Sequence, residues 1–145
     1  SGEVVEVDVI KGACLLLRRA ALDEAGSLNE QYFMYTEEVD LCHRVQAAGW
    51  RLFWVPTAEV VHYGGQSTRQ VAREMFLELY RSKLLYFRIH KGRAGAVLYK
   101  AVLAAAALAR LALSPLALLQ RGEQRQQHLQ LASSYLSLLR ALPTM

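Results

Sequence analysis

The chain has 145 residues, the length of one ordinary domain, and 53% of them are hydrophobic. This is enough apolar surface to bury a core, so a largely disordered protein is excluded. The net charge of +4 is unevenly divided, because residues 1–68 hold five Lys/Arg and ten Asp/Glu, whereas residues 69–145 hold twelve and three. We therefore predict two regions with these bounds, an acidic one and a basic one that meets an anionic partner.

The two cysteines, Cys14 and Cys42, lie among apolar residues, and the sequence has no CxxC pair and no zinc-ligand spacing. Buried, reduced thiols fit this pattern better than a disulfide framework, which favours a cytosolic protein. The segment after Ser1 does not show the basic start, apolar middle and small-residue cleavage site of a secretory signal. We expect a cytoplasmic location.

The acidic region begins with a mixture of short strands and a helix. Alternating valines predict a half-buried strand over residues 4–10, and a continuous apolar run predicts a buried strand over residues 13–17. Residues 18–25 read as a short helix that Gly26 ends.

A loop-like segment that becomes aromatic leads into the next predicted helix. Thr36 is the expected N-cap, and apolar positions recur at helical spacing from residue 37 to 48, where Gly49 supplies the stop. Residues 50–55 and 58–62 predict two short strands on either side of a proline turn. The remainder of the chain reads as helices over residues 68–90, 95–119 with a break near Pro115, and 123–142.

The Ala/Leu-rich stretch over residues 96–119 has about the length of a membrane span, which needs ~20 mostly apolar residues. Lys100 and Arg110 interrupt it, and at 100° per residue they share one broad face with Arg93 and Arg121, as in an amphipathic helix that lies in the plane of a membrane. Three interpretations stay open: a soluble helix packed on the preceding domain, contact with a membrane surface, and insertion.

Three carboxylates crowd the start of the predicted helix at residue 37. Glu37, Glu38 and Asp40 fall within four positions, and crowded titratable groups are typical of sites that need a general base. The structural alternative is that Glu37 and Glu38 complement the helix dipole while Asp40 pairs with Arg44 on a solvated face.

The surrounding sequence favours the catalytic interpretation. Between Gly12 and Ser67 the chain reads, in order, GACLLLRR, AGSLNE, YFMYTEEVDLCHR, AGW, VP and VHYGGQS. This run covers a little over a third of the chain and resembles family 2 glycosyltransferases of the rhamnosyltransferase-like kind. The resemblance implies an α/β fold, namely the C-terminal half of a GT-A (Rossmann-like) nucleotide-sugar transferase domain, followed by a helical tail that is a candidate for membrane association.

The activity implied by the resemblance is inverting transfer of a sugar from a nucleotide-sugar donor to a hydroxyl acceptor, a glycan or a lipid-linked molecule. It would serve cell-surface polysaccharide or lipid-linked oligosaccharide synthesis at the inner face of the cell membrane. In the family, the second member of an acidic pair at the helix start is the catalytic base, and that position falls on Glu38. The family usually has Asp there, so the longer side chain leaves Glu37 as an alternative. Asp40 completes the predicted catalytic set.

His62 matches, by the same resemblance, a histidine that binds a divalent cation, Mg²⁺ or Mn²⁺, together with DxD carboxylates. This sequence has no DxD, and the nearest approximation, Glu6-Val7-Asp8, reads as part of a strand. The cation would neutralise the departing diphosphate.

Four further residues are predicted to bind substrate. By the resemblance, Gly12 and Ala13 would pass close to a bound donor or acceptor sugar, although a β-bulge between strands explains them equally well. Tyr35 would either stack on a sugar or fill the core beneath the helix, and Arg69 would meet the diphosphate as part of a lid over residues 63–69.

Two rival functions remain. One is a non-catalytic module that binds a membrane surface or a protein, and the other is a nucleic-acid binder, which the lack of a recognition motif in the basic helices disfavours. Half a sheet would expose an edge strand, so we expect the missing N-terminal half or self-association to cover it, and we expect the fragment to be inactive without that half. The sequence names neither the donor nor the acceptor.

Overall fold

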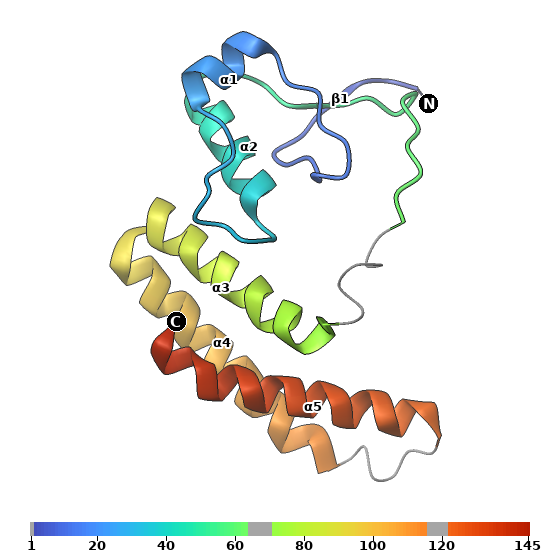
Figure 1. The fold of residues 1–145 in the computed structure, drawn as a ribbon, viewed down its shortest axis with the longest axis vertical. Helices are drawn as coiled ribbons and strands as arrows, with labels where there is room; N and C mark the ends of the chain where they lie inside the picture. The colour runs from blue at the N-terminus through green and yellow to red at the C-terminus, as the bar shows by residue number, and fades with distance from the viewer. Residues whose placement is uncertain (1, 64–70, 116–121) are drawn as a thin grey trace. The chain divides into compact units, whose positions relative to one another are not determined.

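The computed structural model describes residues 2–63, 71–115 and 122–145 and divides the chain into two compact units (Figure 1). Unit 1 is Ser1–Gln70, and unit 2 is Val71–Met145. The predicted division between residues 68 and 69 falls outside the described residues.

Two helices and a small sheet make up the described part of unit 1. The helices are α1 (Arg19–Ala25) and α2 (Glu37–Ala47), and each begins and ends within one residue of the prediction. Both are followed by a glycine with positive φ, Gly26 at 79° and Gly49 at 87°, a conformation that is cheap only for glycine. The strands β1 (Val5–Glu6) and β2 (Phe53–Trp54) pair antiparallel, with Val5 opposite Trp54.

The sheet is smaller than predicted, so the α/β class is represented in the described residues by one two-stranded ladder beside the helices. Residues 13–17 and 58–62 form no strand, and both predictions are wrong. Leu16 is 100% exposed and Cys14 is also exposed, in contrast to the buried Cys42. An apolar run becomes a buried strand only when a neighbouring strand pairs with it, and within the described residues these segments have no such neighbour.

The core of unit 1 lies against one face of α2. Leu41, Cys42 and Val45 recur at helical spacing and pack with Leu52, which precedes β2. Apolar side chains from α1 and from the segments outside helices and strands surround this core: Val7, Ile10, Leu17, Leu22, Ala25 and Trp50.

The described part of unit 2 has three long helices and ends in a short 3₁₀ turn (Figure 1). They are α3 (Ala72–His90), α4 (Gly92–Leu113), α5 (Glu123–Ala141) and η3 (Leu142–Thr144). The three predicted helices are confirmed within the described residues, with α4 beginning three residues earlier than expected and ending just before Pro115. Residues 68–70 and 116–119 of the predicted helices lie outside the described residues.

Apolar and aromatic packing holds unit 2 together. Its core is made of Leu84, Leu103, Leu138 and Leu142, one or more from every element. Around it, the rings of Phe87 and Tyr99 stack at 4.5 Å, which joins α3 to α4. Burial, and then the hydrogen bond with Tyr135 of α5, raises the pKa of Tyr80 on α3 to about 12.

Candidate active site

The chain enters α2 through two residues in a conformation that side chains disfavour. Tyr35 and Thr36 have φ of 68° and 71°, in the left-handed region. This costs of order 1–3 kcal/mol for each non-glycine residue, and such strain concentrates at functional sites. Thr36 occupies the predicted N-cap position, but its side chain makes no capping hydrogen bond. Only its carbonyl takes part, accepting from the N–H of Asp40 at 2.9 Å.

The first two residues of α2 each hold a carboxylate oxygen in an unusual state. Oε2 of Glu37 and Oε2 of Glu38 are buried, and neither has a hydrogen-bond partner within the described structure. A buried acceptor without a donor loses its hydration and gains nothing in return. A purely electrostatic role at the helix start would leave both carboxylates in water, so the dipole explanation alone does not account for their placement.

Gly12 lies beside Glu38, although 25 residues separate them in sequence. A methyl group placed on Gly12 would lie 3.5 Å from Cβ of Glu38 and 4.0 Å from its carboxyl carbon. Gly12 and Ala13 form an exposed turn rather than part of the sheet, so the β-bulge alternative is wrong. The structure thus brings together two residues that were predicted separately, the candidate base and a candidate sugar-contacting glycine.

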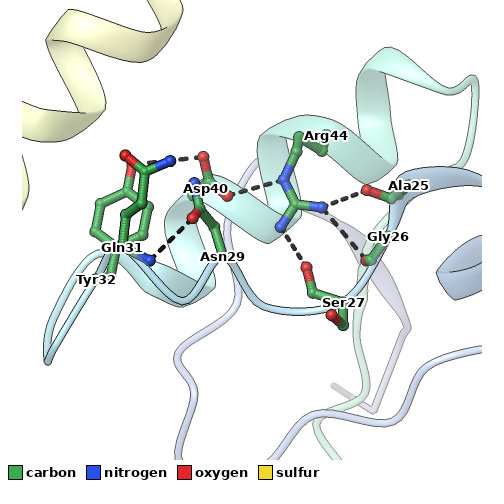
Figure 2. A network of polar contacts seen from close by, with 8 residues as sticks. All are labelled: Ala25, Gly26, Ser27, Asn29, Gln31, Tyr32, Asp40 and Arg44. Carbon is green, nitrogen blue, oxygen red and sulfur yellow. Dashed lines mark hydrogen bonds and ion pairs between the residues drawn. The ribbon is translucent and has the colours of Figure 1, made fainter.

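Asp40 sits differently from the two glutamates. It is completely buried, and its carboxylate accepts from Nε of Arg44 at 2.8 Å and from the Tyr32 hydroxyl at 3.4 Å (Figure 2). The predicted pair with Arg44 is confirmed, but the solvated face is wrong, because only 1% of the Asp40 side chain is exposed. The carboxylate of Asp40 is therefore already bonded within the protein, unlike the Oε2 atoms of Glu37 and Glu38, and its predicted catalytic role stays a prediction.

Arg44 extends this contact to the end of α1. Its guanidinium donates to the carbonyls of Ala25, Gly26 and Ser27, the last at 2.8 Å (Figure 2). These carbonyls belong to the last residue of α1 and the two residues after it, where backbone acceptors lack helical partners. One buried charge pair therefore ties the end of α1 to the first turns of α2 and anchors the loop that carries Tyr32.

The contacts of Asp40 and Arg44 could be predicted only in part from the sequence. The spacing of Asp40 and Arg44 indicates an i, i+4 pair, and this is a local signal. The carbonyls that Arg44 reaches lie 17 to 19 residues earlier, and the Tyr32 contact depends on how the loop folds back. No sequence pattern reports such contacts.

No contact with Glu37 or Glu38 is observed for the other predicted site residues that the structure describes, Tyr35 and His62. Tyr35 is half-buried in the strained entry, and His62 is exposed in a segment without secondary structure. Among the described residues, no group of three or more His, Cys, Asp or Glu is placed to hold a metal ion. Arg69 and most of the predicted lid lie outside the described residues.

Comparison with known proteins adds a family to this geometry. Residues 3–80, more than half of the chain, match the family described as glycosyltransferase like family 2. The match includes Gly12, the start of α2 and His62. No solved structure matches the chain significantly.

Three characterised relatives resemble parts of the chain. The N-acetylglucosaminyl-diphospho-decaprenol L-rhamnosyltransferase of Mycobacterium tuberculosis is 49% identical over 59 residues, which are 41% of this chain and 19% of that protein. Rhamnosyltransferase WbbL of Escherichia coli is 34% identical over 70 residues, 48% of this chain and 26% of that protein. The low-salt glycan biosynthesis hexosyltransferase Agl10 of Haloferax volcanii is 29% identical over 56 residues, 39% of this chain and 18% of that protein. The chain thus spans between 18% and 26% of these relatives.

Proposed function

Because the chain belongs to the family 2-like glycosyltransferases, we propose that it is part of an enzyme that moves a sugar from a nucleotide-sugar donor to a hydroxyl acceptor with inversion. Unit 1 would be the C-terminal part of a GT-A type catalytic domain, and the nucleotide-binding half would come from outside this chain. The names of the relatives support an acceptor in polysaccharide or lipid-linked glycan synthesis.

The proposal depends on the two unpaired carboxylate oxygens at the start of α2. In an inverting displacement the acceptor oxygen forms a bond to the anomeric carbon while the bond from that carbon to the diphosphate breaks, and the hydroxyl proton passes to a carboxylate. We assign this proton to Glu38, whose carboxyl group lies next to the small, exposed turn at Gly12. Glu37 carries the same buried, unpaired oxygen and is the alternative base.

Asp40, Arg44 and Tyr32 act as positioning residues in this proposal. Their contacts fix where α2 begins, and both glutamates occupy its first turn. A general base must lie within about 2.6–3.2 Å of the proton it takes, so a shift of the helix start would remove it from reach.

The substrate contacts are proposed from smaller features. Gly12 has no side chain where it lies beside Glu38, so its backbone and that of Ala13 are proposed to approach a sugar closely, and the half-buried Tyr35 is proposed to stack on it. Arg69, which lies outside the described residues, is proposed from its positive charge within the predicted lid to meet the diphosphate.

A divalent cation, Mg²⁺ or Mn²⁺, remains part of the proposal, with His62 as one ligand. When bound, it would neutralise charge on the departing diphosphate. The described residues do not by themselves fit such a site, since they offer no group of three ligands. Additional ligands would have to come from elsewhere in the complete protein, and the mechanism above does not depend on the cation.

We further propose that the enzyme works in the cytoplasm at the inner face of the cell membrane, where a lipid-linked acceptor would be met. A non-catalytic module that binds a membrane surface or a protein is the competing function. It predicts that neither Glu37 nor Glu38 matters for sugar transfer.

The test is sugar transfer by the complete protein carrying Glu38→Gln or Glu37→Gln, measured with a panel of nucleoside-diphosphate sugars. Loss of the base should lower turnover at least ~100-fold for Glu38→Gln while donor binding is retained. Glu30→Gln is the matched control, because Glu30 is an exposed carboxylate in the same unit. Near-normal turnover in Glu38→Gln together with a large loss in Glu37→Gln would move the base to Glu37. Near-normal turnover in both variants would reject the catalytic proposal.

A further inference from the structure

Helix α4 is apolar on the side that faces away from its own unit. Leu103 and Ala107 pack into the core, at 6% and 0% exposure. On the opposite side lie five large side chains, 57% to 67% exposed, which we call the outer face of α4: Val97, Leu98, Val102, Leu108 and Leu113. An apolar helix surface is normally covered by protein or lipid, whereas the outer face stays largely exposed in the part of unit 2 that the structure describes.

The outer face is long and free of charge. It extends over 17 residues from Val97 to Leu113, and the 16 steps between them span about 24 Å at 1.5 Å per residue. Lys100 is the one charged residue between Arg93 and Arg110, and it is half-buried. In the described part of the chain, α4 is also the one helix long and apolar enough to cross a membrane. An exposed apolar strip of this size marks a surface that binds something.

The packing of unit 2 argues against a spanning helix. α3 and α5 pack against the inner side of α4, and they carry exposed charges at Arg81, Arg88, Arg125 and Arg140. A spanning α4 would either pull these charges into hydrocarbon or leave its core partners. An orientation in the plane of the membrane covers the outer face and keeps α3 and α5 in water.

The positive charge of unit 2 indicates that the outer face of α4 binds an anionic surface. Residues 69–145 hold twelve Lys/Arg against three Asp/Glu, and exposed basic residues flank the outer face, with Lys91 and Arg93 at one end and Arg110 near the other. Anionic headgroups attract basic residues placed next to a buried apolar strip. A second copy of this chain would bring the same positive charge to the interface, which opposes self-association through this face.

We propose that the outer face of α4 docks unit 2 on an anionic lipid bilayer, with α4 lying in the plane of the membrane at the boundary of headgroups and acyl chains. This docking deepens the proposed function, because a transferase held in this way would meet lipid-linked acceptors. Only that benefit rests on the proposed function, and the docking itself does not.

The test is flotation of the full chain with vesicles of equal parts phosphatidylglycerol and phosphatidylcholine. Leu98→Gln with Leu108→Gln should lower the partition coefficient at least about tenfold, because two leucines leave the lipid without any change in charge. Leu129→Gln with Leu136→Gln on α5 is the matched control, since these leucines are 43% and 41% exposed, and it should bind as the parent chain does. Binding should weaken in pure phosphatidylcholine and at high salt.

A second measurement reads the orientation. Labels on Leu98→Cys and Leu108→Cys, each in a Cys14→Ser background, should be quenched equally by brominated lipids at one shallow depth. Depths that differ by about 15 Å, the rise over ten residues, would show a spanning helix and overturn the in-plane docking.

Two further outcomes would overturn the proposal: vesicle binding that the α4 substitutions leave unchanged, and a dimer, formed without vesicle binding, that they abolish. The Glu38→Gln variant should bind vesicles normally. Failure of docking and failure of catalysis are therefore distinguishable.

Discussion

The two units bury different kinds of groups. Unit 1 places a charged pair, Asp40 and Arg44, next to its small apolar core and keeps two carboxylate oxygens buried without partners beside a strained backbone. Unit 2 is held by leucines and aromatic rings and leaves an apolar strip uncovered. Polar burial and strain indicate a site that does chemistry, whereas a simple core with an apolar outer surface indicates a part that docks.

Each unit can be followed separately in the same chain. Both tryptophans, Trp50 and Trp54, belong to unit 1, so their fluorescence reports unfolding of that unit. Most helical residues are in α3, α4 and α5, so far-ultraviolet circular dichroism mainly reports unit 2. Tryptophan fluorescence and circular dichroism together therefore compare the stability of the two units.

The largest effect on stability is expected in unit 1 for Arg44→Ala. Removing the guanidinium leaves the carboxylate of Asp40 buried without its cation and frees three carbonyls after α1, which should cost about 3–5 kcal/mol. In a denaturant titration, the unfolding midpoint measured by tryptophan fluorescence should move to a lower denaturant concentration. The midpoint measured by circular dichroism, which mainly reports unit 2, should not change.

Arg44→Lys sharpens this prediction. Lysine restores the charge next to Asp40 but not the planar group that reaches several carbonyls, so about half of the loss should return. Equal losses for Lys and Ala would show that the carbonyl contacts, rather than the charge, stabilise the unit.

The corresponding change in unit 2 is Leu138→Ala. Leu138 is 0% exposed in the core of α3, α4 and α5, and the cavity should cost about 3 kcal/mol. The circular dichroism transition should move while tryptophan fluorescence does not. A shift of both signals by the same amount would mean that the units unfold together and would break the comparison.

A smaller change in the stability of unit 1, and one of opposite sign, is expected for a substitution at the entry to α2. Thr36→Gly relieves a left-handed conformation and should stabilise unit 1 by about 0.5–1 kcal/mol after the entropy of glycine in the unfolded chain is counted. Thr57→Gly is the control, since Thr57 is exposed and has no positive φ, and it should be neutral or destabilising. If Thr36→Gly also lowers sugar transfer in the complete protein, the strain serves to place Glu37 and Glu38.

The smallest effect is expected for Arg19→Ala. Arg19 and Asp23 form an i, i+4 pair at 2.8 Å, the same separation as between Asp40 and Arg44, but their side chains are 86% and 59% exposed. Water screens such a pair, so its loss should cost less than about 0.5 kcal/mol by tryptophan-monitored unfolding. A cost close to that of Arg44→Ala would contradict the view that burial distinguishes the two pairs.

Several features could be predicted from the sequence because their causes are local. Gly26 and Gly49 end helices by adopting positive φ, Pro115 lies where α4 stops, and the spacing of Asp40 and Arg44 indicates their pair. The family was also recognisable, since its motifs keep their order over residues 12–67 and residues 3–80 match the family. The roles of Glu38, His62 and Arg69 remain predictions.

Other features depended on tertiary structure. The apolar run at residues 13–17 looks like a buried strand, yet its burial requires a neighbouring strand that the described residues do not provide. The prediction that Asp40 is solvated failed because the loop carrying Tyr32 folds over it, and the proximity of Gly12 to Glu38 arises from the same kind of distant contact.

By itself, the sequence determined where the helices begin and end, which residues are acidic at the start of α2, and to which family the chain belongs. Only the tertiary structure decided which of those carboxylates is buried and bonded, which are buried and unpaired, and which side of α4 stays uncovered. The reason is physical: backbone conformation responds to near neighbours along the chain, whereas burial and pairing depend on groups that are far apart in sequence.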